Sequence, residues 1–248
     1  MSKKIDYWYV CHKGLRRTIN QDNYYVPNKA KAQLCPNVES VRCGSTVPGK
    51  SAVFAIFDGM GGEECGEMAS YLCTGYLDDF FFHENAQEDL ASFCMKANSK
   101  VVEYAKENDI YSMGSTAALA RVDDCGVTTC NLGDSRIYRI GPCGIELISF
   151  DHCVSYAGRK SYLYQYVGIP EKETLIEPYI AQCEYRANDL FLLCSDGLSD
   201  FVSESTIYNI VIRNALEQGD GQKAAELMLA EALEAGGKDN ISFILLQI

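Results

Sequence analysis

Short β-type runs and pairs of helix-like segments follow one another along this chain without the strict strand–helix alternation that builds a parallel sheet. The first clear β-type run is residues 52–57 (AVFAIF), four more lie between residues 115 and 148, and ISFILLQI closes the chain. Apolar residues at helical spacing occur in two pairs of segments, 63–82 with 86–107 and 203–216 with 220–235. This order predicts an α+β fold, a four-layer α-β-β-α sandwich of two antiparallel sheets flanked by helix pairs.

Turn residues divide the β-rich part of the chain. They separate the runs TAALARV, GVTTCNL, SRIYRI and IELIS, which indicates an antiparallel meander. Further strands are expected within 174–185 and 189–194. Residues 27–50 are rich in Pro, Gly, Ser and Asn, so we expect a surface loop between two early strands.

Acidic residues outnumber basic ones by 34 to 22, which gives a net charge of −12. Nucleic acids and anionic membranes attract clustered Lys and Arg, so we expect this chain to bind neither. It has no run of about 18 apolar residues, and its N-terminus turns charged before a signal-peptide core could form, which favours a cytoplasmic protein. The 12 cysteines stand in no C-x-x-C spacing, so we expect reduced thiols rather than a structural zinc site.

Four aspartates stand where a β-type run meets a tight turn: Asp58, Asp134, Asp196 and Asp239. A carboxylate at the end of a buried run is costly unless water, hydrogen bonds or a cation compensates it. An isolated Asp-Gly is usually just a turn, but four such aspartates together predict a metal site. Because all the donors are hard oxygens, magnesium or manganese fits better than zinc or copper. The glycines after Asp58 and Asp196 let the backbone approach closely.

Seven motifs along the chain resemble those of one family. They are GLRRTINQDNY, VFAIFDGMGGEECGEMAS, GSTAALARV, NLGDSRIYRI, DH at 151–152, DLFLLCSDGLSDFVS and GGKDNISFILL, and they span residues 14–246. The chain is thereby similar to the metal-dependent serine/threonine protein phosphatases, the PPM or type-2C family, in its bacterial single-domain form. The resemblance implies the same layered sandwich, with residues 1–248 forming one domain.

The resemblance also implies roles for the aspartates. Asp58 is expected to bridge two Mn²⁺ or Mg²⁺ ions, and Gly59 to offer its carbonyl oxygen to one of them. Asp196 and Asp239 are expected to bind the other ion. Asp134, together with Asp196, matches the position of a weaker third ion.

Four further residues are expected around the metals. Arg17 matches the arginine that grips the substrate phosphate, and Asp22 lies behind the ligands in this family. Gln21 stands where many members have Glu, so we expect it to reach the metals through bound water at most. Asn240 belongs to the DN motif beside Asp239.

The implied activity is hydrolysis of phosphoserine and phosphothreonine in proteins by water that attacks phosphorus directly. The expected partners are phosphoproteins and a cognate serine/threonine kinase, and the expected state is a monomer. Two alternatives stay open, a weakly catalytic regulator that binds phosphoproteins (a pseudophosphatase) and a phosphatase of small phosphomonoesters. They stay open because Gln21 departs from the family and because CVSYAG replaces the longer helical flap that bacterial relatives carry after residue 152.

Overall fold

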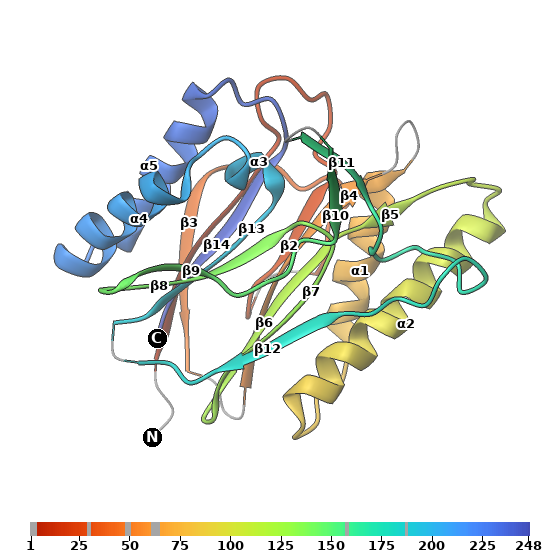
Figure 1. Cartoon of the computed structure of the whole chain (residues 1–248), viewed down its shortest axis with the longest axis horizontal. Helices are drawn as coiled ribbons and strands as arrows, with labels where there is room; N and C mark the ends of the chain where they lie inside the picture. Colours follow the sequence, from red (N-terminus) through yellow and green to blue (C-terminus); the bar gives the residue numbers. More distant parts are fainter. Residues whose placement is uncertain (1–3, 29–30, 48–50, 61–64, 157–158, 187) are drawn as a thin grey trace.

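The structure of this chain is a computed structural model that describes residues 4–28, 31–47, 51–60, 65–156, 159–186 and 188–248. It is built around two large antiparallel sheets (Figure 1). The first sheet has the strand order β3 (Val38–Thr46), β1 (Ile5–His12), β14 (Ile241–Gln247), β13 (Leu190–Cys194), β8 (Arg136–Gly141) and β9 (Gly144–Leu147). The second has the order β12 (Tyr179–Cys183), β7 (Gly126–Leu132), β6 (Ala117–Asp123), β4 (Ser51–Met60) and β2 (Asp22–Tyr25), and the short β5 (Gly114–Ser115) pairs with the end of β4. A separate hairpin consists of β10 (Cys153–Tyr156) and β11 (Arg159–Leu163).

Helices cover the outer face of each sheet, which confirms the predicted four layers. The second sheet is covered by α1 (Gly66–Asp79) and α2 (Ala86–Glu107). The first sheet is covered by α3 (Asp196–Ser199), α4 (Glu204–Ile210), the π-helical η1 (Val211–Glu217) and α5 (Gly221–Glu234). In Figure 1 the two helical layers lie on opposite sides of the paired sheets.

Strand β4 shows why a continuous apolar run is needed in this fold. Ala55 and Phe57 pack against the helical layer, whereas Phe54 and Ile56 pack between the two sheets. Both faces of the strand are therefore buried, and alternation of side chains places Asp58 on the same face as Phe54 and Ile56. The carboxylate thus lies at the end of the layer between the sheets.

The prediction of a surface loop over residues 27–50 is wrong for its second half. Residues Val38–Thr46 form β3, which pairs with β1 at the edge of the first sheet. Only Val38 and Val41 of this strand are buried, and most of the other side chains are exposed. An edge strand with so few apolar residues gives no periodic signal in the sequence.

The four runs between residues 115 and 148 are strands as predicted, but they do not form one meander. β6 and β7 belong to the second sheet, while β8 and β9 belong to the first. The chain crosses between the sheets at the turn after β7, where Gly133 has φ 97°. Glycine tolerates this left-handed conformation, which other residues rarely adopt. The crossing places Asp134 between the sheets.

The predicted helices are confirmed, with shifted ends. α4 begins after Ser203, whose hydroxyl caps the helix by accepting a hydrogen bond from the Thr206 amide (3.2 Å). The segment predicted as one helix over 203–216 widens into η1, in which the Asn214 side chain donates to the Ile210 carbonyl (2.8 Å). In a regular α-helix the Ile210 carbonyl accepts a hydrogen bond from the main-chain amide of Asn214. The Asn214 side chain therefore competes with that amide for the same acceptor. Residues 63–64 of the predicted helix 63–82 lie outside the described residues.

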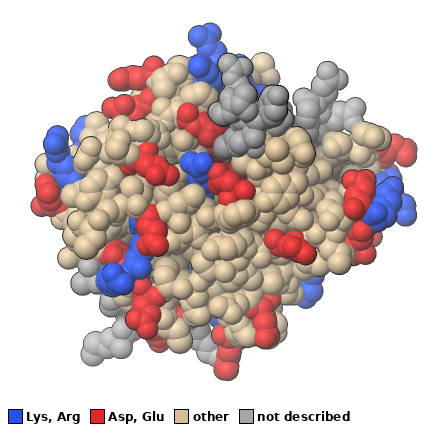
Figure 2. All heavy atoms as spheres, viewed as in Figure 1, with Lys and Arg blue, Asp and Glu red and all other residues tan. Residues whose placement is uncertain are grey.

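Charged side chains of both signs are mixed over the surface in Figure 2. On the face in Figure 2, the described Lys and Arg side chains are scattered among acidic ones and form no continuous basic patch. Among the described residues, no helix combines the length and apolar character needed to span a bilayer.

Candidate active site

Two aspartates face each other at one end of the second sheet. Asp22 opens β2 and stands directly opposite Asp58 in β4; it is 1% exposed. Beside them the Gly59 amide donates to the Gln21 carbonyl (3.1 Å). A Cβ atom at Gly59 would lie 2.4 Å from this same oxygen and 2.1 Å from the Gly66 carbonyl oxygen. This close approach is the reason that the sequence has glycine there.

The first sheet brings two more aspartates to this end. Asp196 follows β13 and Asp239 precedes β14, and these strands are antiparallel neighbours, so both residues lie at the same edge. A Cβ atom at Gly197 would lie 1.8 Å from the Asn240 carbonyl oxygen, so this glycine too is needed. The Ser195 hydroxyl donates to Asp22 Oδ2 (2.8 Å) and links the two sheets directly beneath the cluster.

The fifth aspartate, Asp134, enters from the turn between the sheets and is 7% exposed. Two hydroxyls fix this turn against β4. The Asp58 amide donates to Thr116 Oγ1 (3.0 Å), and the hydroxyls of Thr116 and Ser135 share a hydrogen bond (2.6 Å). The main chain at Asp58 is thereby connected to the residue after Asp134.

The aspartates are close enough to affect one another electrostatically. Burial raises the pKa of Asp58 well above its ordinary value, and it is raised further by the charges of Asp22, Asp196, Asp134 and Asp239. Burial also raises the pKa of Asp22 to about 6, although hydrogen bonds from Ser242 and Ser195 oppose this. Carboxylates in this situation are destabilised when ionised, and a cation would remove the strain.

Arg17 supplies positive charge at the edge of the cluster. Its Nε and Nη2 donate to the two carboxylate oxygens of Asp239, at 2.9 and 2.7 Å. This hydrogen bonding raises the pKa of Arg17, as do the nearby charges of Asp196 and Asp58. The Arg17 side chain is 51% exposed, so it borders solvent while Nε and Nη2 are engaged by Asp239.

The donor atoms of the cluster suit a hard divalent cation. They are carboxylate and main-chain oxygens, and Oδ1 of Asp22 is buried without a hydrogen-bond partner among the described residues. Within that part of the chain, no three His, Cys, Asp or Glu side chains stand close enough to enclose a metal ion. Arg17 engages the carboxylate of Asp239 instead. The residues therefore fit magnesium or manganese by the type of donor atom and by the repulsion between the carboxylates around Asp58. In this structure Arg17 occupies the carboxylate of Asp239.

Comparison with known proteins identifies the family. The family model described as protein phosphatase 2C matches residues 42–234, which include Asp58, Asp134 and Asp196. The chain belongs to the protein phosphatase 2C family. Arg17, Asp22 and Asp239 lie outside the matched range, and the fold brings them to the same place.

Two bacterial proteins are among the curated relatives of this phosphatase 2C chain. The serine/threonine phosphatase stp of Listeria innocua is 27% identical over 225 residues, covering 80% of this chain and 85% of the relative. The protein phosphatase PhpP of Streptococcus pneumoniae is 26% identical over 258 residues, covering 95% and 94%. The crystal structure of the serine/threonine phosphatase PstP of Mycobacterium tuberculosis superposes with a TM-score of 0.77 at 24% identity over 99% of both chains, which shows the shared fold.

Gln21, a departure from the phosphatase 2C pattern, is a junction between segments. Its amide donates to Asn240 Oδ1 (2.8 Å), and its carbonyl accepts from Gly59 and from Ser70 Oγ (2.6 Å). Its side chain donates to Glu67 Oε2 (3.1 Å), so an acidic group stands next to the amide. Asn240 also donates to the carbonyls of residues 13 and 19 and so holds the loop that carries Arg17.

Sequence reasoning missed several residues that support this phosphatase 2C site. They are all polar groups in buried or tightly packed positions: Glu67, Ser70, Thr116, Ser135, Ser195 and Ser242. The available signal was a polar residue inside or next to a buried run, as in LLCSDG. That signal does not say which distant partner each hydroxyl reaches.

The sequence predicted only a short segment after His152, in place of the helical flap of bacterial phosphatase 2C proteins. In the structure this segment is a hairpin. The β10–β11 hairpin follows His152, and its tip, residues 157–158, lies outside the described residues. His152 connects it to the site, because Nδ1 accepts from the Gly133 amide (3.2 Å) and the His152 amide donates to the Gly133 carbonyl (2.9 Å). These two hydrogen bonds hold the DH turn to the main chain at Gly133.

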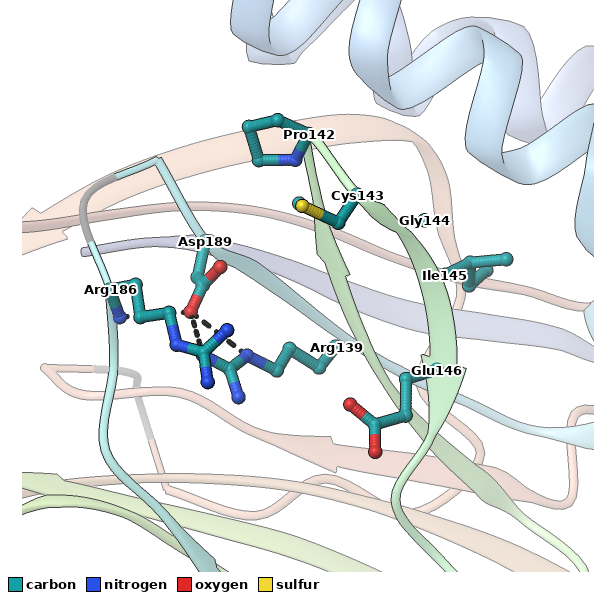
Figure 3. A pocket seen from close by; sticks show the side chains of 9 residues that line it. Arg139, Pro142, Cys143, Gly144, Ile145, Glu146, Arg186 and Asp189 are labelled. Carbon is teal, nitrogen blue, oxygen red and sulfur yellow. Dashed lines mark hydrogen bonds and ion pairs between the residues drawn. The ribbon is translucent and has the colours of Figure 1, made fainter.

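A hollow of about 410 Å³ elsewhere on the molecule contains none of the predicted site residues of this phosphatase 2C chain. It lies beside the β8–β9 turn and is lined by both acidic and basic side chains (Figure 3). Asp189 accepts hydrogen bonds there from the Arg139 side chain and from the Arg186 amide (2.9 Å). Its carboxylate is therefore compensated within the protein, whereas the surroundings of Asp58 oppose its charge.

Proposed function

We propose that this chain is a metal-dependent protein phosphatase that removes phosphate from phosphoserine and phosphothreonine. Membership of the protein phosphatase 2C family and the serine/threonine phosphatase named among its relatives support this function. The observation that carries it is the convergence of acidic residues from both sheets on Asp58, with a raised pKa and an arginine at the edge. A purely structural cluster would be neutralised by its own partners.

The residues that would hold the ions follow from the cluster. Asp58 and the Gly59 carbonyl, with Asp196 and Asp239, would hold two Mn²⁺ or Mg²⁺ ions, and Asp134 would add a site for a third. When bound, such ions activate a water molecule and neutralise the charge on phosphoryl oxygens. The Thr116–Ser135 hydroxyl pair and the Ser195–Asp22 hydrogen bond would keep the carboxylates in place while ions exchange.

Arg17 would bind the substrate phosphate. Its guanidinium already donates in parallel to two oxygens of one anion, Asp239, and a phosphate presents the same geometry. Because the side chain is half exposed, a phosphorylated residue can reach it from solvent. Asn240 and Gln21 would hold the Arg17 loop against the metal ligands.

The domain organisation, location and substrates are part of the proposal. We propose that residues 1–248 act as one domain and as a cytoplasmic monomer, and that the substrates are products of a serine/threonine kinase. The coverage of 99% of both chains in the mycobacterial comparison supports the single domain. Family membership supports the choice of substrates.

The test is metal-dependent phosphate release from a phosphothreonine peptide and from p-nitrophenyl phosphate. We expect turnover with Mn²⁺ or Mg²⁺, none in EDTA, and none in Asp196→Asn. The matched control is Asp79→Asn at the exposed end of α1, which should retain turnover. Undiminished turnover in EDTA would contradict the proposed chemistry.

Peptide binding and the choice between substrates separate the two alternative functions. A pseudophosphatase would bind the phosphopeptide in calorimetry and release no phosphate with either ion. A phosphatase of small phosphomonoesters would turn over sugar phosphates faster than phosphopeptides.

A further inference from the structure

Four aromatic rings form a row from the edge strand β12 towards the site, and all of them except His152, which is 5% exposed, reach the surface. Tyr179 in β12 lies 5.9 Å from Phe150, Phe150 lies 5.4 Å from His152, and His152 lies 5.8 Å from Tyr164, measured between ring centroids. Phe150 is 50% exposed, Tyr179 43% and Tyr164 42%. We call these four residues the aromatic row. Large rings that are grouped and exposed in this way mark interaction surfaces.

The aromatic row is anchored to the turn that carries Asp134. His152 exchanges hydrogen bonds with the main chain of Gly133, the residue before Asp134. Asn131 fixes Phe150 from both sides, because its Oδ1 accepts from the Phe150 amide (3.0 Å) and its Nδ2 donates to the Phe150 carbonyl (2.7 Å). The row therefore begins beside the carboxylate cluster and is rigidly held to it.

The electrostatic character of the row favours a cation. The faces of aromatic rings carry negative potential. Exposed Glu177 stands two residues before Tyr179, and its amide donates to Gln165 Oε1 (2.8 Å), next to Tyr164. The nearby cation Arg136 is already paired with Asp151 (2.7 Å). In Figure 2 a broad area without charged side chains occupies the middle of the face on which β12 lies in Figure 1.

We propose that the aromatic row binds an arginine or lysine side chain of the substrate polypeptide, a preference that rests on the phosphatase activity proposed above. The occupant is a cation because the π faces, Glu177 and the net charge of −12 all attract one. The steps between rings, 5.4 to 5.9 Å, correspond to nearly two residues of extended chain. The whole row therefore matches about five residues of extended chain, so we place the basic residue in the same short segment as the phosphorylated residue.

The test compares two phosphothreonine peptides that differ in one respect. One has arginines near the phosphothreonine, and the other has citrulline, which is neutral and similar in shape. For the wild type we expect kcat/KM to be about tenfold higher with arginine. In Phe150→Leu and Tyr179→Leu, which keep apolar bulk but lose the π face, the ratio should fall to about twofold.

Phe81→Leu is the matched control, because Phe81 is 75% exposed and does not belong to the row. It should keep the wild-type ratio. Equal rates with both wild-type peptides would overturn the inference and leave the phosphatase activity standing. A ratio unchanged in Phe150→Leu would also overturn it, since the preference would then come from net charge alone.

Binding distinguishes failure of the inference from failure of the proposed function. If neither peptide is hydrolysed, the proposed activity fails, and fluorescence anisotropy with labelled versions of the two peptides still measures the ratio of affinities. A higher affinity for arginine that depends on Phe150 and Tyr179 supports the row. Equal affinities contradict it.

Discussion

Asp58 and Asp89 are both largely withdrawn from solvent, yet their surroundings shift their pKa values in opposite directions. Burial by itself would raise the pKa of Asp89, but hydrogen bonds from His83 and Arg121 outweigh it, and the pKa is lowered. Arg121 Nη1 donates to Asp89 Oδ2 at 2.6 Å, and these side chains are 4% and 7% exposed. Around Asp58 the neighbours are carboxylates, and the pKa is raised.

The difference separates a carboxylate whose charge the fold satisfies from one whose charge the fold opposes. The charge of Asp89 is satisfied within the fold, as is that of Asp189 beside Arg139. The charge of Asp58 is opposed by the fold, so its stabilisation has to come from a ligand. A buried aspartate therefore indicates a site only when its neighbours share its sign.

The largest expected effect is on turnover in Asp58→Asn. Removing this carboxylate should lower kcat at saturating Mn²⁺ at least about a thousandfold. In EDTA the same change should raise the free energy of unfolding by about 1 kcal/mol, because one repelling charge is gone. Phosphate release and thermal melting measure the two effects. If Asp58→Asn is inactive and also less stable than the wild type in EDTA, the fold does not oppose the charge of Asp58 and the prediction is wrong.

Asp89→Asn should show the reverse pattern. We expect the free energy of unfolding in urea to fall by about 3 kcal/mol, because buried Arg121 loses its closer counter-ion and keeps only Asp123 at 3.9 Å. Turnover per folded molecule should be retained. Asp79→Asn at the surface is the control for removing an acidic group, and its stability should change little. A loss of turnover in Asp89→Asn without loss of stability would place this residue in the site after all.

Substitutions of Arg17 test whether the edge of the aspartate cluster binds the substrate phosphate. Arg17→Ala should raise KM for a phosphothreonine peptide about tenfold, because two parallel hydrogen bonds to phosphate are lost. Arg17→Lys keeps the charge but not the fork, so an intermediate KM is expected. Steady-state kinetics on both variants measures this. Equal KM values for wild type and Arg17→Ala would exclude Arg17 from substrate binding.

The pH dependence of stability is the smallest effect. The folded-state pKa of Asp89 lies below the ordinary value of 3.8, so the stability it contributes is fully present above that value. This contribution is lost as the pH falls through the lowered folded-state pKa. The difference in melting temperature between the wild type and Asp89→Asn should therefore be constant from pH 7 to 5 and narrow below pH 4. A difference that widens in acid would mean that the pKa is raised.

Much of the fold was predictable from hydrophobic periodicity. The buried strand AVFAIF and the four helical segments have strong patterns, and the layers follow from them. β3 was not predictable, because Val38 and Val41 are its only buried residues and its stability comes from pairing with β1. The sheet change after β7 was also missed, since Gly133 looks like any turn glycine until the partners of β8 are known.

Some residues of the candidate site likewise have a local signal in the sequence, and others have none. Asp58, Asp134, Asp196 and Asp239 were predictable because a carboxylate at the end of a buried run is locally costly. The pairing of Arg17 with Asp239, 222 residues apart, has no local signal. Neither has the role of Gln21, whose main chain and side chain join three other segments.

By itself the sequence determined the strongly periodic strands and helices and which carboxylates end a buried run, because these depend on neighbours along the chain. Only the tertiary structure decided which sheet each strand joins, which hydroxyl holds which carboxylate and that exposed rings form a row beside the site. Those outcomes depend on residues that meet only after the chain has folded, and a linear pattern does not record such meetings.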